Sequence, residues 1–183
     1  HGFNMVTFDN VRVPKKNLVG EQNRGWYVGA TLLDFERSGV DYSAGGRRVL
    51  EELIAYAKDN DQNGSLIASN AIMRNRLADL AIEVDVSRLI SYNIAWMQGE
   101  GLVPNKESSM GKIVGTELQQ HLSETGMQML GLHGQLEPGS KYAPMQGRIE
   151  HMHLTNVSET IQAGTSEIQR NIIATRGLGL PRG

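Results

Sequence analysis

Two hydrophobic patterns follow one another along the chain. Over residues 5–20 apolar and polar residues alternate, with Pro14 and Gly20 as breaks, which is typical of one or two β-strands and a turn. From Gly25 onward the apolar residues recur at helical spacing instead. The pattern therefore predicts the end of a β structure followed by a mainly helical part.

The helical part is predicted to begin with one long helix over residues 25–58. Leu32, Leu33, Glu36 and Val40 share one face of this helix. Three glycines weaken it locally, because glycine costs about 1 kcal/mol relative to alanine inside a helix. These glycines are Gly39, Gly45 and Gly46.

The next helix follows a polar break, DNDQNGS, and carries two apolar stripes. One stripe passes through Met73 and Leu77, and the other passes through Ile82 and Val86. A helix with two apolar stripes is usually covered on two sides. We therefore expect this helix inside a bundle or at a contact between subunits.

Two more helices complete the predicted set. Apolar residues at helical spacing mark a third helix over residues 114–129. The last helix begins near Ser166, where Gln169 completes a capping-box pattern, and it ends before Gly177. The prolines and glycines in residues 133–153 predict a long loop before it. Four helices predict an all-α fold, an antiparallel four-helix bundle.

Composition and charge exclude several classes of function. The chain has 183 residues, 39% of them hydrophobic and 21% charged, as expected for one main globular domain. A net charge of −2 provides no strong field for nucleic acid or an anionic membrane, so neither is expected as a partner. No apolar run approaches the roughly 20 residues of a membrane-spanning helix, and no signal peptide is recognised.

The cysteine count and the first residue add two expectations. No cysteine is present, which excludes disulfides and thiolate chemistry and suits a reducing compartment, so we expect a cytoplasmic protein. Redox chemistry would then need a cofactor. Because the chain opens on His1 rather than methionine, we expect it to be a piece of a longer protein.

Two local motifs offer candidate chemistry. The corner Gly164-Thr165-Ser166 precedes a helix, and a helix N-terminus can hold a phosphate, a carbonyl or the negative charge of a reduced flavin. The alternative is a well-capped surface helix. His151 and His153 are placed like two ligands on one side of an extended segment, but no acidic or cysteine partners cluster nearby. We therefore expect no metal site.

Four segments together resemble the C-terminal half of the acyl-CoA dehydrogenase family. In chain order they are VTFDNVRVPKKNLVGEQNRGW, LLDFERSGV, QMLGLHG and AGTSEIQRNIIATRGLGLP. The resemblance covers nearly the full chain, and the last segment is highly specific. It implies a flavoprotein that uses FAD to oxidise an acyl-CoA thioester to the 2,3-enoyl-CoA, with hydride transfer to FAD.

The resemblance also implies neighbours and partners. It makes residues 1–24 the end of a middle β-barrel domain and residues 25–183 the C-terminal helical-bundle domain. A helical domain and most of the barrel would precede them. Electrons would pass to an acceptor resembling electron-transfer flavoprotein, and the chain would assemble into a homotetramer or a heterotetramer with a related chain.

The family resemblance assigns the proton-abstracting base to Glu36. Many members carry a catalytic glutamate directly before Gly-Thr-Ser, where this sequence has Ala163. A smaller group, similar to isovaleryl-CoA and long-chain acyl-CoA dehydrogenases, carries the base on an earlier helix before an arginine, here Glu36 before Arg37. The expected helical neighbours of Glu36 are apolar or glycine, so we expect burial to raise its pKa toward neutrality. The alternative is a surface carboxylate paired with a neighbouring helix.

The remaining substrate contacts are assigned to Arg37, Ala163 and Gly164. Ala163 and Gly164 would line the thioester, and the small side chain at 163 leaves room for Glu36. Arg37 has Asp34 and Asp41 within helical reach, so ordinary surface ion pairs are the favoured interpretation of this residue.

Cofactor contacts are assigned by resemblance to two motifs. Thr165, Ser166 and Glu167 match positions that contact the flavin. Gln128, Gly131 and Gly134 match the family's Gln-x-x-Gly-Gly-x-Gly, in which Leu132 replaces a glycine. A leucine there is expected to hinder the close backbone approach that glycine permits.

A third family motif is altered in this sequence. Family members carry Arg-x-x-Phe-Gly, whose arginine and phenylalanine hold the FAD of a neighbouring subunit. This chain has Asn60 and Asn63 at those places, so the cationic partner of the pyrophosphate is missing. Two functions remain open: a catalytic acyl-CoA dehydrogenase chain, or a non-catalytic structural subunit of a heteromeric acyl-CoA dehydrogenase.

Overall fold

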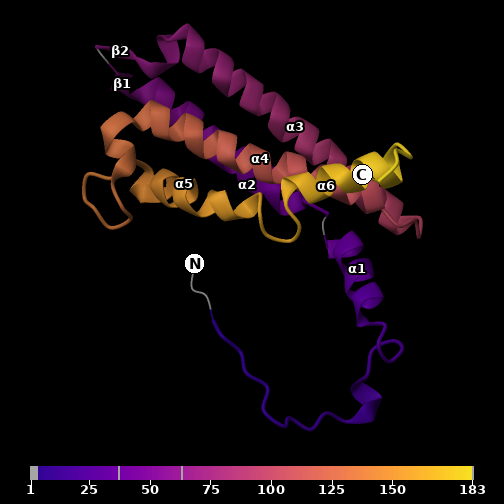
Figure 1. The fold of residues 1–183 in the computed structure, drawn as a ribbon. Helices are drawn as coiled ribbons and strands as arrows, with labels where there is room; N and C mark the ends of the chain where they lie inside the picture. Colours follow the sequence, from indigo (N-terminus) through magenta and orange to yellow (C-terminus); the bar gives the residue numbers. More distant parts are fainter. Residues whose placement is uncertain (1–3, 37, 63, 183) are drawn as a thin grey trace.

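The computed structural model describes residues 4–36, 38–62 and 64–182 of the chain. Four helices, α2, α3, α4 and α5, run side by side with alternating direction, and α6 packs across α4 (Figure 1). This arrangement confirms the predicted all-α bundle. The helices are α1 (Gly25–Glu36), α2 (Val40–Asp59), α3 (Ala71–Gly99), α4 (Asn105–Leu130), α5 (Arg148–Glu159) and α6 (Ser166–Ile172).

The core lies where α2, α3, α4 and α5 meet. On α3 the predicted stripe of Met73, Leu77, Leu80 and Val84 is buried. Its second stripe is not covered within the described chain, since Ile82 is 62% exposed. The other buried apolar side chains that pack against this stripe are Val49, Leu50, Leu53, Ala57, Ile67, Leu118, Leu122, Met129, Leu130 and Ile149.

The alternating segment over residues 5–20 forms no strand in the described chain. It contains a single 3-10 turn at Lys15–Asn17, and its described side chains are exposed. A strand needs a neighbouring strand for its backbone hydrogen bonds, and the described chain places none beside this segment. Elsewhere, the described residues form one short two-stranded antiparallel sheet, β1 (Asp61–Gln62) with β2 (Ser65–Leu66).

The predicted long helix over residues 25–58 is two helices, so that prediction is wrong. α1 ends at Glu36, and α2 begins after Gly39, which has a φ of 72°. This left-handed conformation is costly for residues other than glycine. The apolar residues on the two sides of the break keep the spacing of a single helix, which is why one continuous helix was predicted. None of the described side chains of α1 is buried, and α1 lies at the end of the bundle (Figure 1).

The predicted loop over residues 133–153 is also too long, because α5 begins at Arg148. Gly147, at a φ of 75°, ends the preceding turn and allows the helix to start. Ile149 is fully buried and ties α5 to the core. The fourth helix of the bundle is therefore α5, and the predicted last helix, α6, is an addition to it. No helix in the described part of the chain is long and apolar enough to cross a membrane.

Candidate functional site

The end of α1 and the loop before α6 meet at a small cavity. Its volume is about 130 Å³, and its walls come from α1, α2, α4 and the loop between α5 and α6. Two of the predicted site residues, Glu36 and Ala163, are brought together here although they are far apart in sequence. The lining residues are Glu36, Gly39, Asp41, Tyr42, Lys112 and Ala163.

Glu36 occupies the last position of α1 and is exposed. The expectation that its own helical neighbours desolvate it is wrong, because the helix ends at Glu36 and Gly39 and Val40 do not follow it on the same helix. The Glu36 carbonyl accepts a hydrogen bond from Ser38 N at 2.8 Å, which closes the turn toward α2. Arg37 lies outside the described residues.

Tyr42 forms the wall of the cavity contributed by α2. Its ring packs on the backbone of Gly115, where a Cβ would lie 2.6 Å from Tyr42 Cδ2, so only glycine fits there. The Tyr42 hydroxyl donates a hydrogen bond to Glu159 Oε2 at 3.5 Å. Burial, followed by the charges of Glu159, Asp41 and Glu36, raises the pKa of Tyr42 to about 12. The hydroxyl is therefore a neutral donor at physiological pH.

The raised pKa of Tyr42 predicts a specific loss of stability at alkaline pH. In the unfolded chain tyrosine titrates near pH 10, so the folded state favours the protonated hydroxyl. This contribution to the free energy of unfolding is complete below about pH 10 and is lost as the pH rises through about 12. In denaturant titrations across this range, Tyr42→Phe should lose less stability than the unchanged protein. An identical pH slope in both proteins would contradict the assignment.

Lys112 is buried beside this wall and joins α4 to the end of α5. Its side chain is only 3% exposed, and Nζ donates a hydrogen bond to the Glu159 carbonyl at 2.8 Å. Sequence patterns did not point to Tyr42, Lys112 or Glu159. The run SSMGKIVGT around Lys112 was a usable signal, because small residues on a helix predict the close approach of another element.

The corner before α6 is held in an uncommon backbone conformation. Ala163 has a φ of 54° and Gly164 a φ of 93°, and the left-handed region is unfavourable for alanine. Gln169, fully buried on α6, donates from Nε2 to both carbonyls, at 3.3 Å to Ala163 and 3.1 Å to Gly164. Ser166 N donates to Thr160 O at 3.0 Å. These bonds fix the corner against the cavity.

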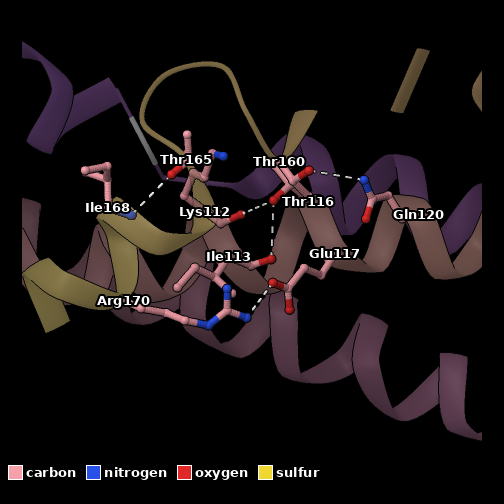
Figure 2. A network of polar contacts seen from close by, with 9 residues as sticks. All are labelled: Lys112, Ile113, Thr116, Glu117, Gln120, Thr160, Thr165, Ile168 and Arg170. Atoms are coloured by element: carbon pink, nitrogen blue, oxygen red, sulfur yellow. Dashed lines mark hydrogen bonds and ion pairs between the residues drawn. The ribbon is translucent and has the colours of Figure 1, made fainter. Parts of the chain in front are cut away.

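The predicted capping box is replaced by a different cap. Thr165, not Ser166, is the N-cap of α6, and its hydroxyl accepts from Ile168 N at 3.3 Å. Figure 2 shows this cap next to α4, with Gln120 donating to Thr160 and Arg170 paired with Glu117 at 2.6 Å. The predicted partner of Ser166, Gln169, points instead toward the corner carbonyls.

The three predicted flavin contacts on this corner border a second cavity of about 360 Å³. Ser166 Oγ is buried and has no hydrogen-bond partner within the described chain, so a polar group bound in the cavity would satisfy it. A hydrogen bond from Thr165 lowers the pKa of Glu167, which is therefore an anionic acceptor. The residues present fit a ligand rich in hydrogen-bonding atoms, as a flavin is.

The other predicted cofactor motif lies at the opposite end of α4. From Thr116, beside the corner, to Gly131 the helix rises by roughly 20 Å, so one chain does not bring the two motifs together. Gly131 ends α4 at a φ of 57°, and Gly134 is buried against Leu130 and Met127. Leu132 is 83% exposed.

The altered family motif lies directly beside this end of α4. Gln62 Nε2 donates to the carbonyls of Gln128 at 3.4 Å and Met129 at 3.5 Å. Asn60 Nδ2 donates to Tyr56 O at 3.0 Å. Asn63 lies outside the described residues. The side chains of Asn60 and Gln62 thus both donate to backbone carbonyls, and neither side chain carries a positive charge.

The two histidines considered as metal ligands lie on α5, not on an extended segment. His151 and His153 are two residues apart, a spacing that does not place side chains on one face of a helix. Within the described residues no group of three or more histidine, cysteine or acidic side chains is arranged to hold a metal ion.

Comparison with known proteins identifies the class. The family model of the acyl-CoA dehydrogenase C-terminal domain matches residues 23–178, and the chain therefore belongs to the acyl-CoA dehydrogenase family. Among its relatives is acyl-CoA dehydrogenase FadE26 of Mycobacterium tuberculosis, 33% identical over 180 residues, which cover 96% of this chain and 45% of that protein. The caffeyl-CoA reductase-Etf complex subunit CarC of Acetobacterium woodii is 29% identical over 92% of this chain and 43% of that protein.

A solved structure agrees with this relationship. The ChsE4-ChsE5 complex from Mycobacterium tuberculosis matches with a TM-score of 0.83 and 32% identity, over 96% of this chain and 46% of that one. The chain thus spans less than half the length of the proteins it matches.

Proposed function

We propose that this chain is the C-terminal part of an FAD-dependent acyl-CoA dehydrogenase, which converts an acyl-CoA thioester to the 2,3-enoyl-CoA. The observation that carries the proposal is the cavity in which Glu36 meets the Ala163 corner. Residues 1–24 are the end of the middle β domain in this proposal, and residues 25–183 are the helical-bundle domain.

Glu36 is the base in this reaction. Its carboxylate takes the proton from the carbon next to the thioester carbonyl, and Ala163, with only a methyl group, leaves space for the thioester. FAD bound beside this cavity would supply the hydride acceptor for the next carbon, so that the carbon–carbon double bond would form between the two carbons. In the proposal Gly164 lines the thioester together with Ala163. Thr165, Ser166 and Glu167 hold the flavin.

The exposure of Glu36 is consistent with this role if another part of the protein closes the cavity. Several large apolar side chains on α1 and the segment before it are exposed, including Phe8 at 81% and Trp26 at 82%. Burial of such side chains is strongly favourable. In our proposal the preceding domains cover this surface and exclude water from Glu36.

A second candidate function rests on the altered motif near Asn60. A chain that offers no cation to a neighbour's FAD can still act beside a related chain that does, or serve it as a structural subunit. One of the similar structures is that of the ChsE4-ChsE5 complex, and CarC is a subunit of a caffeyl-CoA reductase-Etf complex. We propose a heteromeric tetramer, an electron acceptor of the electron-transfer flavoprotein type, and a cytoplasmic location. Gln128, Gly131 and Gly134 then face the neighbour's cofactor.

The absorption spectrum of the full-length protein, purified with its partner, tests the proposed function. We expect a flavin band that bleaches when an acyl-CoA is added without an electron acceptor, because Glu36 and the flavin remove two hydrogens from the substrate. The measurement is a titration with acyl-CoAs of different acyl groups. A flavin that no acyl-CoA reduces, or a protein without flavin under all conditions of purification, would contradict the proposal.

A further inference from the structure

A third cavity, larger than the one that holds Glu36, lies beside Tyr42. Its volume is about 430 Å³, and α2, α4 and α5 form its walls. Tyr42 and Asp41 border both this cavity and the one that holds Glu36. We call this larger space the polar cavity. Besides Tyr42 and Gly45, it is lined by Asp41, Gln119, Asn156, Glu159 and Gln162.

The walls of the polar cavity are unusual for a place that receives an acyl group. Ala163 provides the largest aliphatic side chain in the lining of the two cavities as the structure describes it. Ligand pockets are in general lined mainly by apolar side chains. An alkyl chain would displace water from these polar groups without replacing the hydrogen bonds that the water made.

Several donors of the polar cavity are already engaged. Gln119 Nε2 donates to Tyr42 O at 3.0 Å, and Asn156 Nδ2 donates to Gln119 O at 2.8 Å. The Tyr42 hydroxyl donates to Glu159. The strongest hydrogen-bonding groups that remain are the carboxylates of Asp41 and Glu159, each with lone pairs to spare. The cavity therefore suits a ligand that donates hydrogen bonds.

The charges in the lining of the two cavities restrict the chemical class of the ligand further. Glu36, Asp41 and Glu159 are acidic, while the ammonium of Lys112 is turned to the Glu159 carbonyl. A carboxylate on the ligand would be repelled by these groups. A hydroxyl group donates a hydrogen bond without adding negative charge.

We propose that the polar cavity receives the distal part of the acyl group and selects acyl-CoA thioesters that carry a hydroxyl group beyond the reacting carbons. Asp41 and Glu159 are the specificity-determining residues, and the two cavities adjoin where Asp41 and Tyr42 line both of them. The inference rests on the proposed function, since it names the substrate class of the same site.

Binding measurements on the full-length flavoprotein test the inference without requiring turnover. The probes are acyl-CoA analogues with sulfur in place of the β-carbon, which have no β-hydrogen to lose. A length series of these thioesters ends in a methyl, a hydroxyl or a carboxylate group. Calorimetry should show the best hydroxyl thioester binding about tenfold more tightly than its methyl counterpart, the usual scale for one hydrogen bond to a charged group. The carboxylate counterpart should bind more weakly than both.

Substitutions assign the preference to its residues. Glu159→Gln should reduce both the preference for a hydroxyl group and the discrimination against a carboxylate group. Asp41→Asn should change binding in the same direction. Because Asp41 is exposed, this second variant keeps the test valid even if Glu159→Gln folds poorly. Glu150→Gln is the matched control, because it makes the same change on α5 outside both cavities.

The outcomes separate this inference from the proposed function. Methyl thioesters that bind as tightly as hydroxyl thioesters, in a protein whose flavin bleaches with acyl-CoA, overturn the inference alone. A preference for hydroxyl thioesters in a protein whose flavin never bleaches supports the inference and overturns the proposed dehydrogenase activity. Absence of binding by every thioester overturns both.

Discussion

Replacing Glu36 by glutamine in the full-length protein is expected to slow the reduction of the flavin by acyl-CoA by about a hundredfold or more, the lower scale for the loss of a general base. Glutamine keeps the size of the side chain but cannot take a proton. Because glutamine is nearly isosteric with glutamate and Glu36 is the last residue of α1, folding should be unaffected. Rapid mixing with acyl-CoA, followed at the flavin band, measures the rate.

The control for this prediction is Glu51→Gln, the same change at an exposed position of α2 away from the cavity. It should bleach at the unchanged rate. Near-normal bleaching in Glu36→Gln would remove Glu36 from the mechanism. Adding Ala163→Glu to the Glu36→Gln variant should restore part of the rate, since both positions line one cavity, although the positive φ of Ala163 makes any larger side chain there unfavourable.

Sequence patterns predicted the parts of the fold that depend on local spacing. The stripe from Met73 to Val84 is buried because its spacing matches one face of a single helix. Ile82, on the other face, is exposed because no element within the described chain covers it. The break at Gly39 was missed because a short turn can preserve apolar spacing from one helix to the next.

The site was predictable only where one residue could be compared with a family motif. Glu36 and Ala163 were identified in this way, and the structure places them on one cavity. Tyr42, Lys112 and Glu159 were missed because they come from α2, α4 and α5, and their contact depends on how those helices pack. The degree of exposure of Glu36 likewise depends on tertiary structure, which helical periodicity alone cannot supply.

Replacing Asn60 by arginine is expected to tighten FAD binding by the full-length protein expressed alone by roughly ten- to a hundredfold. A charge-assisted hydrogen bond to a phosphate contributes on the order of 1.5 to 3 kcal/mol. In the unchanged chain, the Asn60 amide is bonded to Tyr56 O, and Gln62 reaches the carbonyls at the end of α4. Equilibrium dialysis against FAD measures the change.

Two controls separate a pyrophosphate site from a general effect of charge. Asn60→Gln should bind FAD no more tightly than the unchanged protein does. Asn93→Arg adds the same charge at an exposed position on α3, and it should not tighten FAD binding either. With a partner chain that supplies the arginine, the unchanged protein should form a two-plus-two tetramer holding about two flavins, since only the two sites that face the partner's arginine then have a cation for the pyrophosphate. The unchanged chain could instead form a homotetramer that binds a full complement of flavin, with no rise in FAD affinity on Asn60→Arg. That result would show that the missing arginine is harmless. Glu36 would then act in a symmetric enzyme, without any division of labour between chains.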